Sequence, residues 1–386
     1  MDHDQTDKKY HHRPKHWIGC EIENEYFGEE RKADKLARKQ ASAKDRSKYK
    51  KTDQRKESNQ PKDFKGNRED YVEGRVLSIA SQGVIVDVNG EFLTCMLRGS
   101  LKKEKTQYKN LVTVGDIVLI EPGSPSEGSI VFVEPRKTVL SRAENLSRRK
   151  EQLIAANIDQ VLITCSVVSP ALKPSLIDRY IIAAQKGRMN PIIVINKIDL
   201  LQSKDVDPVF LEKEINTYQE LLKAYQMANI PVISLSSVTG EGIDLLKRQM
   251  ANQASVFSGQ SGVGKSSLIN EVTGQSLRIG GMVKKTNKGA HTTSTAQLLR
   301  LEFGGWCIDT PGIKSFGVWD LAKEELEQYF PEIFTRGRQC RFPDCSHLQE
   351  EGCAVISAVD NGEISHLRYE SYISLMLNSD EGYMRR

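Results

Sequence analysis

The sequence predicts a multidomain chain in which a polar N-terminal segment precedes a small all-β barrel, an α/β domain and a mostly helical metal-binding domain. Short β-type runs separated by turn residues fill the region from Tyr71 to Arg142. Apolar strands then alternate with helical stretches, as in a parallel α/β sheet, and a cluster of cysteines and a histidine follows near the C-terminus. We therefore expect four segments, at residues 1–69, 70–142, 143–315 and 316–386.

Composition sets the broad class. The chain has 386 residues, which is long enough for more than one core, and its formal net charge is +4. No run approaches the roughly 18 apolar residues that suggest a membrane span, and the charged N-terminus has no apolar signal stretch. We expect a cytoplasmic protein without membrane association. Seven cysteines, an odd number, favour reduced thiols and a metal site over a disulfide framework.

The N-terminal segment is polar and strongly basic. Residues 31–68 carry 15 Lys or Arg against 5 Asp or Glu, a net charge of +10. Such a segment buries too little apolar surface to fold alone, so we expect a disordered arm. It either contacts nucleic-acid phosphates or is an inert solvated tail, and the sequence leaves both open.

Five short β-type runs predict a barrel of the OB type, a common platform for single-stranded nucleic acid. The predicted strands are Glu73–Ile79, Gly83–Val88, Glu91–Met96, Asp116–Ile120 and Ser129–Val133. Basic residues in one connection would line a binding face: Arg98, Lys102, Lys103 and Lys105. The alternative is a structural barrel that only packs on its neighbour.

The α/β domain is predicted from apolar strands and intervening helices. The strands are Gln160–Cys165, Pro191–Ile195, Val232–Leu235, Ala254–Phe257 and Gly305–Ile308. The helices are Ser175–Lys186, Val209–Met227, Ile243–Met250 and a helix from Lys265 to about Asn270.

A phosphate-binding loop joins one of these strands to its helix. Residues 259–266 fit the pattern G-x-x-x-x-G-K-[ST], in which backbone N–H groups surround the phosphates of a nucleotide at a helix N-terminus. Lys265 would reach the β- and γ-phosphates, and the Ser266 hydroxyl would hold Mg²⁺. The residues expected to contact the nucleotide here are Gly259, Gln260, Ser261, Gly262, Val263, Gly264, Lys265, Ser266 and Ser267.

Two further stretches predict that the base is guanine. The strand ending at Ile195 leads into Asn196-Lys197-Ile198-Asp199, the N-K-x-D pattern of guanine-nucleotide-binding proteins. An Asp carboxylate accepts two hydrogen bonds from guanine N1–H and its 2-amino group, and it would stay unpaired against adenine. Ser236-Ser237 begins a stretch similar to the S-A-x-x-G-x-G element, whose backbone N–H meets guanine O6.

Two switch segments complete the expected site. Asp309 and Gly312 belong to a D-x-x-G pattern, whose Asp reaches Mg²⁺ through water and whose Gly N–H contacts the γ-phosphate. In the first switch a threonine closes over Mg²⁺. The choice between Thr292 and Thr293 stays open, and we take Thr293 for a Mg²⁺ site with Ser266 and Asp309.

The order of these patterns is unusual, because the guanine-specific stretches precede the phosphate loop and both switches. A circular permutation of a Ras-like P-loop GTPase domain keeps the same site when the original termini are adjacent. The second switch then leads directly into the C-terminal domain.

The C-terminal domain contains the spacing C-x₄-C-x-H-x₅-C. Three thiolates and one imidazole form a closed tetrahedral set for a structural Zn²⁺: Cys340, Cys345, His347 and Cys353. Nearby arginines at 336, 338 and 341 could grip phosphates. Other cysteines in strand-like runs are expected to be core residues: Cys95, Cys165 and Cys307.

A small barrel, a permuted GTPase domain and this zinc spacing together resemble the ribosome small-subunit-dependent GTPase A family, from about Tyr71 to the C-terminus. The resemblance implies binding to the small ribosomal subunit late in its maturation, subunit-stimulated hydrolysis of GTP to GDP, and release. It also implies that barrel and zinc domain contact rRNA. We expect a monomer. The alternatives are an rRNA-binding scaffold that barely hydrolyses GTP, and a permuted GTPase that acts on the large subunit or on another RNA.

The resemblance also bears on catalysis. Ras-like enzymes orient the attacking water with a Gln just after D-x-x-G, and Ile313 stands there in this chain. His291 matches a His in the family's G-R-H-T-T pattern, although Ala290 replaces the Arg. The catalytic residues implied are His291 and Lys265. The alternative is that His291 only packs or contacts rRNA.

Overall fold

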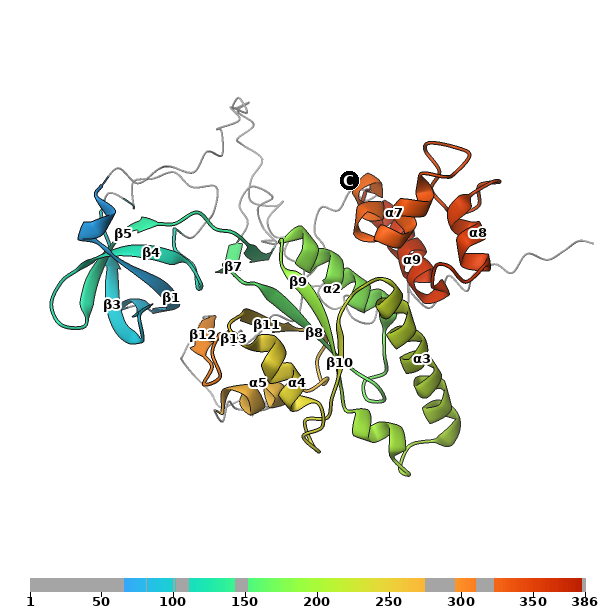
Figure 1. The fold of residues 1–386 in the computed structure, drawn as a ribbon, viewed down its shortest axis with the longest axis horizontal. Helices are drawn as coiled ribbons and strands as arrows, with labels where there is room; N and C mark the ends of the chain where they lie inside the picture. The colour runs from blue at the N-terminus through green and yellow to red at the C-terminus, as the bar shows by residue number, and fades with distance from the viewer. Residues whose placement is uncertain are drawn as a thin grey trace, which may run out of the picture.

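The computed structural model describes residues 66–80, 82–99, 101, 111–142, 152–274, 296–309 and 323–383. These residues form a barrel at one end of the molecule, an α/β domain in the middle and a helical domain at the other end (Figure 1). The arm at residues 1–65 lies outside the described residues. None of the helices described is long and apolar enough to cross a membrane.

The N-terminal barrel is of the OB type, as predicted. Strand β1 pairs with both β2 and β4, β2 pairs with β3, and β5 closes the ring between β3 and β4. Alternate strand residues such as Val76, Val86 and Ile120 are fully buried inside it, as the two-residue period of a strand requires. The strands are β1 (Val72–Ala80), β2 (Gly83–Val88), β3 (Glu91–Leu97), β4 (Ile117–Pro122) and β5 (Glu127–Val133).

The α/β domain has five parallel strands in the order β10-β9-β8-β11-β13, with β12 antiparallel at the edge. They are β8 (Gln160–Ser166), β9 (Asn190–Asn196), β10 (Val232–Ser234), β11 (Ala254–Ser258), β12 (Gln297–Arg300) and β13 (Trp306–Asp309). All but β12 were predicted from their apolar runs.

Helices cover both faces of this sheet. In β9, Ile193 and Ile195 pack toward one face with α2 and α3, while Ile192 and Val194 pack toward the other with α4 and α5. A strand buried on both faces reads as a continuous apolar run, which is why β8 and β9 were recognised. The helices are α2 (Pro174–Lys186), α3 (Pro208–Met227), α4 (Ile243–Met250) and α5 (Lys265–Thr273).

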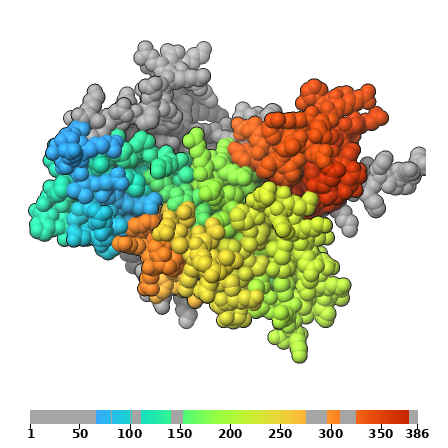
Figure 2. All heavy atoms as spheres, viewed as in Figure 1, coloured from blue at the N-terminus to red at the C-terminus, as the bar shows by residue number. Residues whose placement is uncertain are grey.

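Barrel and α/β domain share one continuous sheet of eleven strands. The join is the antiparallel pairing of β1 with β12, through Ser78 and Gln297. Arg75 of β1 also lies over the ring of Trp306 at 5.7 Å, and Figure 2 shows the β12–β13 hairpin against the barrel. A second small sheet pairs β6 (Val139–Arg142) with β7 (Gln152–Ala156), so paired strands flank the expected boundary after residue 142.

The C-terminal domain is helical, as expected. Its elements are α6 (Lys323–Leu326), the 3₁₀ turn η4 (Glu327–Tyr329), α7 (Pro331–Gly337), α8 (Ala354–Asp360) and α9 (His366–Tyr383). Pro331 stands at the first turn of α7, where its missing N–H leaves no hydrogen bond unmade. Helices α8 and α9 were not predicted.

A buried ionic network fastens this domain to α2 and α3. Arg368 of α9 is 1 % exposed and pairs with Asp178 of α2 and with Glu332 of α7. Tyr225 of α3 donates a hydrogen bond of 2.8 Å to Asp178 and lies under the Arg368 guanidinium. Burial alone would lower the pKa of Arg368, but Asp178 and Glu332 outweigh it and raise that pKa. The guanidinium therefore stays charged.

Candidate functional site

The carboxyl ends of the five parallel strands meet at one edge of the sheet. In open α/β sheets this edge is where ligands bind. The predicted phosphate loop follows β11, and the Asn196–Asp199 segment follows β9. The Ser236–Ser237 segment lies just beyond β10, and Asp309 is the last residue of β13. The fold thus brings together segments that are far apart in the sequence.

The phosphate loop has the backbone its glycines allow. Gly259 has φ +139° and Gly264 has φ +97°, conformations that side-chain-bearing residues rarely adopt. A Cβ at Gly259 would lie 2.0 Å from the Thr164 carbonyl oxygen, and one at Gly264 would lie 2.3 Å from Asn196 Nδ2. The loop therefore packs directly against β8 and the guanine segment. Helix α5 begins at Lys265, so its N-terminal N–H groups face the loop.

Lys265 lies over the loop it belongs to. Its ammonium donates to the carbonyl oxygens of Gly259 and Gln260, at 2.6 and 2.7 Å. These contacts keep the charge inside the curve of backbone where phosphate oxygens would sit. A phosphate would be a stronger acceptor than these neutral carbonyls.

Asn196 connects the predicted phosphate loop to both segments that are predicted to bind guanine. The residue is fully buried, and its Nδ2 donates to the Val263 carbonyl at 2.9 Å. Its Oδ1 accepts from the backbone N–H groups of Lys197 at 2.8 Å and Ser237 at 3.1 Å. One side chain therefore sets the distance between the phosphate and base ends of the site.

Lys197 and Asp199, which follow Asn196 in the chain, contact different neighbouring loops. Lys197 has φ +66°, and its ammonium donates to the carbonyl oxygens of Ser169 and Gly262, at 2.5 and 2.7 Å. Burial lowers the pKa of Lys197, and Asp199 opposes that shift. Asp199 Oδ1 accepts a 2.5 Å hydrogen bond from the Ser236 hydroxyl. Each carboxylate oxygen can accept more than one hydrogen bond, so both oxygens can still accept from a base.

The segment between β8 and α2, residues 167–173, adjoins the predicted site although no sequence pattern pointed to it. It contacts Lys197 through Ser169, and Pro170 lies 3.7 Å from where a Cβ of Gly262 would be. No charged or glycine-rich pattern marks this segment. The only signal was its position after a buried strand in a parallel sheet.

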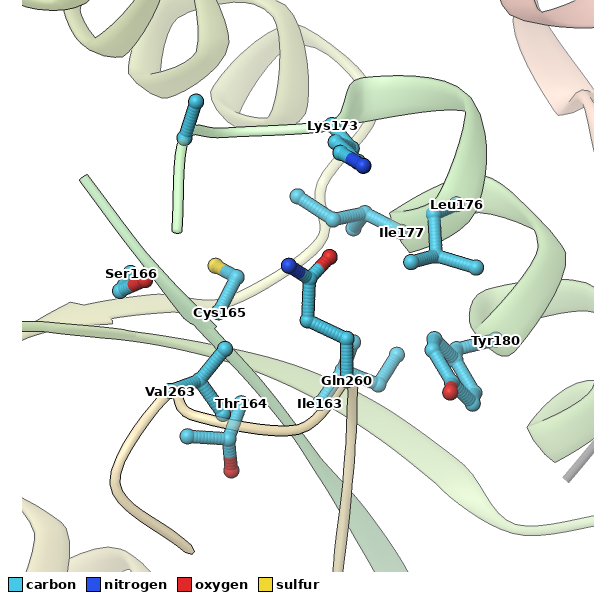
Figure 3. A pocket seen from close by; sticks show the side chains of 11 residues that line it. Ile163, Thr164, Cys165, Ser166, Lys173, Leu176, Ile177, Tyr180, Gln260 and Val263 are labelled. Carbon is cyan, nitrogen blue, oxygen red and sulfur yellow. The ribbon is translucent and has the colours of Figure 1, made fainter. Parts of the chain in front are cut away.

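Gln260 of the phosphate loop turns its side chain away from the loop. Figure 3 shows its amide in a hollow with Cys165, Ile177 and Tyr180. Only the backbone of Gln260 is thus placed toward a phosphate. Burial raises the pKa of Cys165 to about 12, so this thiol is a core residue, as expected.

Several expected site residues lie outside the described residues: His291, Thr292, Thr293 and Gly312. For Asp309 the backbone alone is placed, at the end of β13. Their roles remain sequence-based predictions. The basic residues Lys102, Lys103 and Lys105 also lie outside the described part of the chain, whereas Arg98 forms an exposed ion pair with Glu121.

The four predicted metal ligands come together in the C-terminal domain. One ligand atom from each of Cys340, Cys345, His347 and Cys353 lies within 4.8 Å of all the others. The sulfurs of Cys340 and Cys353 are 3.8 Å apart, and His347 Nδ1 lies 3.5 and 3.4 Å from them. A zinc tetrahedron with Zn–S of about 2.3 Å and Zn–N of about 2.0 Å has edges of roughly 3.8 and 3.5 Å. The donor set therefore fits a metal ion of this kind.

Backbone groups support the sulfurs. The N–H groups of Ala354 and Ile356 point at the sulfurs of Cys340 and Cys353, at 3.3 and 3.5 Å. Such contacts stabilise thiolates, the form in which cysteine binds metal.

Phosphate-loop and guanine segments on one sheet edge, in this chain order, define a P-loop GTPase with a circularly permuted domain. The family model described as RsgA GTPase matches residues 133–319. The small ribosomal subunit biogenesis GTPase RsgA of Bacteroides fragilis strain YCH46 is 36% identical over 299 residues, covering 77% of this chain and 93% of that protein. Its counterpart from Chlorobaculum parvum is 38% identical over 318 residues, covering 80% and 98%.

Two solved structures are similar to this chain in fold and in sequence. YjeQ from Thermotoga maritima has a TM-score of 0.63 at 34% identity, covering 80% of this chain and 98% of that one. YloQ, described as a circularly permuted GTPase, has a TM-score of 0.62 at 28% identity, covering 81% and 96%. This chain belongs to the RsgA GTPase family. Membership implies hydrolysis of GTP.

Proposed function

We propose that this protein binds the small ribosomal subunit late in its maturation, hydrolyses GTP when bound there, and is released by that hydrolysis. The observation that carries the nucleotide part is Asn196, whose buried amide holds the phosphate loop and both guanine segments in one site. The partner is inferred from the relatives, which are named as small-subunit biogenesis GTPases. A protein with this partner would work in the cytoplasm, and we expect it to act as a monomer.

Each segment then has a role in the nucleotide site. Asp199 would accept two hydrogen bonds from guanine, and the Lys197 stem would lie along the base. The backbone N–H groups of Gly259–Ser267 and the Lys265 ammonium would bind the phosphates. Bound Mg²⁺ would neutralise phosphate charge, with Ser266, Asp309 and either Thr292 or Thr293 as the residues that hold it.

The hydrolytic step needs a group that orients water. Ile313 cannot do this, because its side chain has no polar atom. His291 would orient or polarise the water once the subunit brings it near the γ-phosphate. We expect His291→Ala to keep GTP affinity and lose subunit-stimulated turnover. The matched control is His366→Ala, since His366 is an exposed histidine at the start of α9.

The Cys₃His cluster would hold one structural Zn²⁺. All four positions of the tetrahedron are filled by protein ligands, which leaves none open for a substrate. The segment between α7 and α8 has few apolar residues of its own, so the ion would contribute directly to its folding.

Exposed aromatic and basic groups support contact with rRNA at both ends of the molecule. On the barrel, Phe92 and Met96 of β3 are 59 % and 58 % exposed. Beside the metal ligands, Phe342 is 43 % exposed and the Arg341 guanidinium lies 5.4 Å from its ring. Aromatic rings stack on unpaired bases and guanidinium groups bind phosphate, so Phe92 on the barrel offers a stacking contact and the Phe342–Arg341 pair offers both kinds of contact.

The test is GTP hydrolysis measured alone, with purified small subunits, and with large subunits at equal concentration. We expect strong stimulation by small subunits only. Lys265→Ala should abolish it, whereas Lys213→Ala, an exposed lysine on α3, should not. Tight small-subunit binding without stimulation would favour a scaffold in which GTP is a conformational ligand. Stimulation by large subunits would contradict the proposed partner.

A further inference from the structure

The two ring nitrogens of His347 have different surroundings. Nδ1 faces the sulfurs of Cys340 and Cys353 at 3.5 and 3.4 Å. Nε2 points the other way, is buried, and makes no hydrogen bond with the described residues. A neutral imidazole carries one proton, and a buried N–H without an acceptor is costly. The metal site therefore needs an acceptor on the Nε2 side.

The neighbouring tyrosines do not supply one. The hydroxyl of Tyr369 donates to the His347 carbonyl oxygen at 2.7 Å, and that of Tyr372 donates to the Ser346 carbonyl oxygen at 3.4 Å. These contacts fix the backbone of the loop, where His347 has φ +60°. They hold the residue in place but leave the ring orientation to another group.

Glu327 presents a carboxylate oxygen to the Nε2 side of the ring. Its Oε1 lies 3.6 Å from His347 Nε2, with the Glu327 side chain 30 % exposed and the histidine 2 % exposed. The backbone of Gly337 passes beside both atoms. A Cβ there would lie 2.3 Å from Glu327 Oε1 and 3.1 Å from His347 Nε2, so a glycine is what leaves room for the contact.

We propose that Glu327 is a positioning residue of the metal site. Its carboxylate accepts a hydrogen bond from Nε2–H, which fixes the tautomer with the proton on Nε2 and directs the unprotonated Nδ1 toward the three sulfurs. The same contact joins the metal segment to η4, which lies C-terminal to the predicted second switch in the sequence. This inference rests on the proposed zinc occupancy.

The test is the zinc dissociation constant of the full-length protein, measured by competition with a chromogenic chelator. Glu327→Ala should raise it about 10- to 100-fold, the usual effect of removing such a partner. Glu327→Gln should raise it less, because an amide oxygen still accepts the hydrogen bond and keeps the side-chain shape. Glu325→Ala is the matched control, an exposed glutamate two residues away on α6, and should change nothing.

Melting at increasing zinc concentration separates ligand positioning from a purely structural role. A variant that only binds zinc more weakly should melt at the wild-type temperature in excess chelator, and should fall below wild type by a constant amount once both proteins are saturated with zinc. A loss of melting temperature already present in chelator, or an unchanged dissociation constant in Glu327→Ala, would overturn the inference. If the wild-type protein holds no zinc, the proposed zinc occupancy is wrong. If it holds zinc and Glu327→Ala binds zinc equally well, only the role of Glu327 is wrong.

Discussion

Replacing Asn196 by alanine tests how the nucleotide site is held together. The substitution removes four hydrogen bonds of the buried junction: three short ones, to Val263 O, Lys197 N and Ser237 N, and a longer one of 3.4 Å to the Ser237 hydroxyl. At about 1 kcal/mol for each of the three short bonds, the free energy of unfolding should fall by roughly 3 kcal/mol or more. The affinity for GDP should fall at least about tenfold, because the phosphate and base segments lose their common spacer.

The assay is urea unfolding followed by circular dichroism, together with calorimetric titration of GDP. The matched control is Asn190→Ala, since Asn190 is an exposed asparagine at the opposite end of the same strand. Asn190→Ala should change the unfolding free energy by less than about 0.5 kcal/mol and leave GDP binding intact. If Asn196→Ala behaves like this control, Asn196 does not organise the site.

Three further substitutions test separate parts of the structure. Gly264→Ala should abolish nucleotide binding in the same titration, because its Cβ would lie 2.3 Å from Asn196 Nδ2 at φ +97°. Arg368→Met should cost about 3–5 kcal/mol in urea unfolding, since it leaves Asp178 buried without its cation, and adding Asp178→Asn should recover part of that loss. Burial alone would raise the pKa of Glu350, but hydrogen bonds from the Ser346 hydroxyl and backbone N–H groups lower it from 4.5 to about 2. A depressed carboxyl pKa stabilises the fold above the unfolded value, so Glu350→Gln should destabilise the protein at pH 7, with the difference from wild type shrinking as the pH falls from 4.5 toward 2.

Local patterns predicted the parts of the structure that depend on local chemistry. Helix α4 has the predicted bounds Ile243–Met250, and β2 has the predicted bounds Gly83–Val88. The phosphate loop and the metal ligands were recognised because their function requires particular residues at fixed spacing. The four metal-ligand atoms do gather within one site, which spacing alone had indicated.

The features that the sequence did not predict depend on contacts between residues far apart in the chain. Strand β12 is short, and its pairing with β1 joins Ser78 to Gln297, a relation that no local pattern carries. No sequence pattern marks Arg368 as a buried cation, yet it is 1 % exposed and pairs with Asp178, which is far away in the chain. Glu327 likewise gains its significance only through His347. Such pairs become visible once the fold is known.

If the permuted segments form one guanine-specific site, nucleotide binding by the wild-type protein and by Asp199→Asn should show it. Wild type should bind GDP and not ADP, because only guanine offers Asp199 two donors. An asparagine there replaces one acceptor by a donor, so the variant should lose GDP and gain xanthosine diphosphate, which has a carbonyl in place of the 2-amino group. Equal binding of GDP and ADP by wild type, or unchanged GDP binding in Asp199→Asn, would contradict the account.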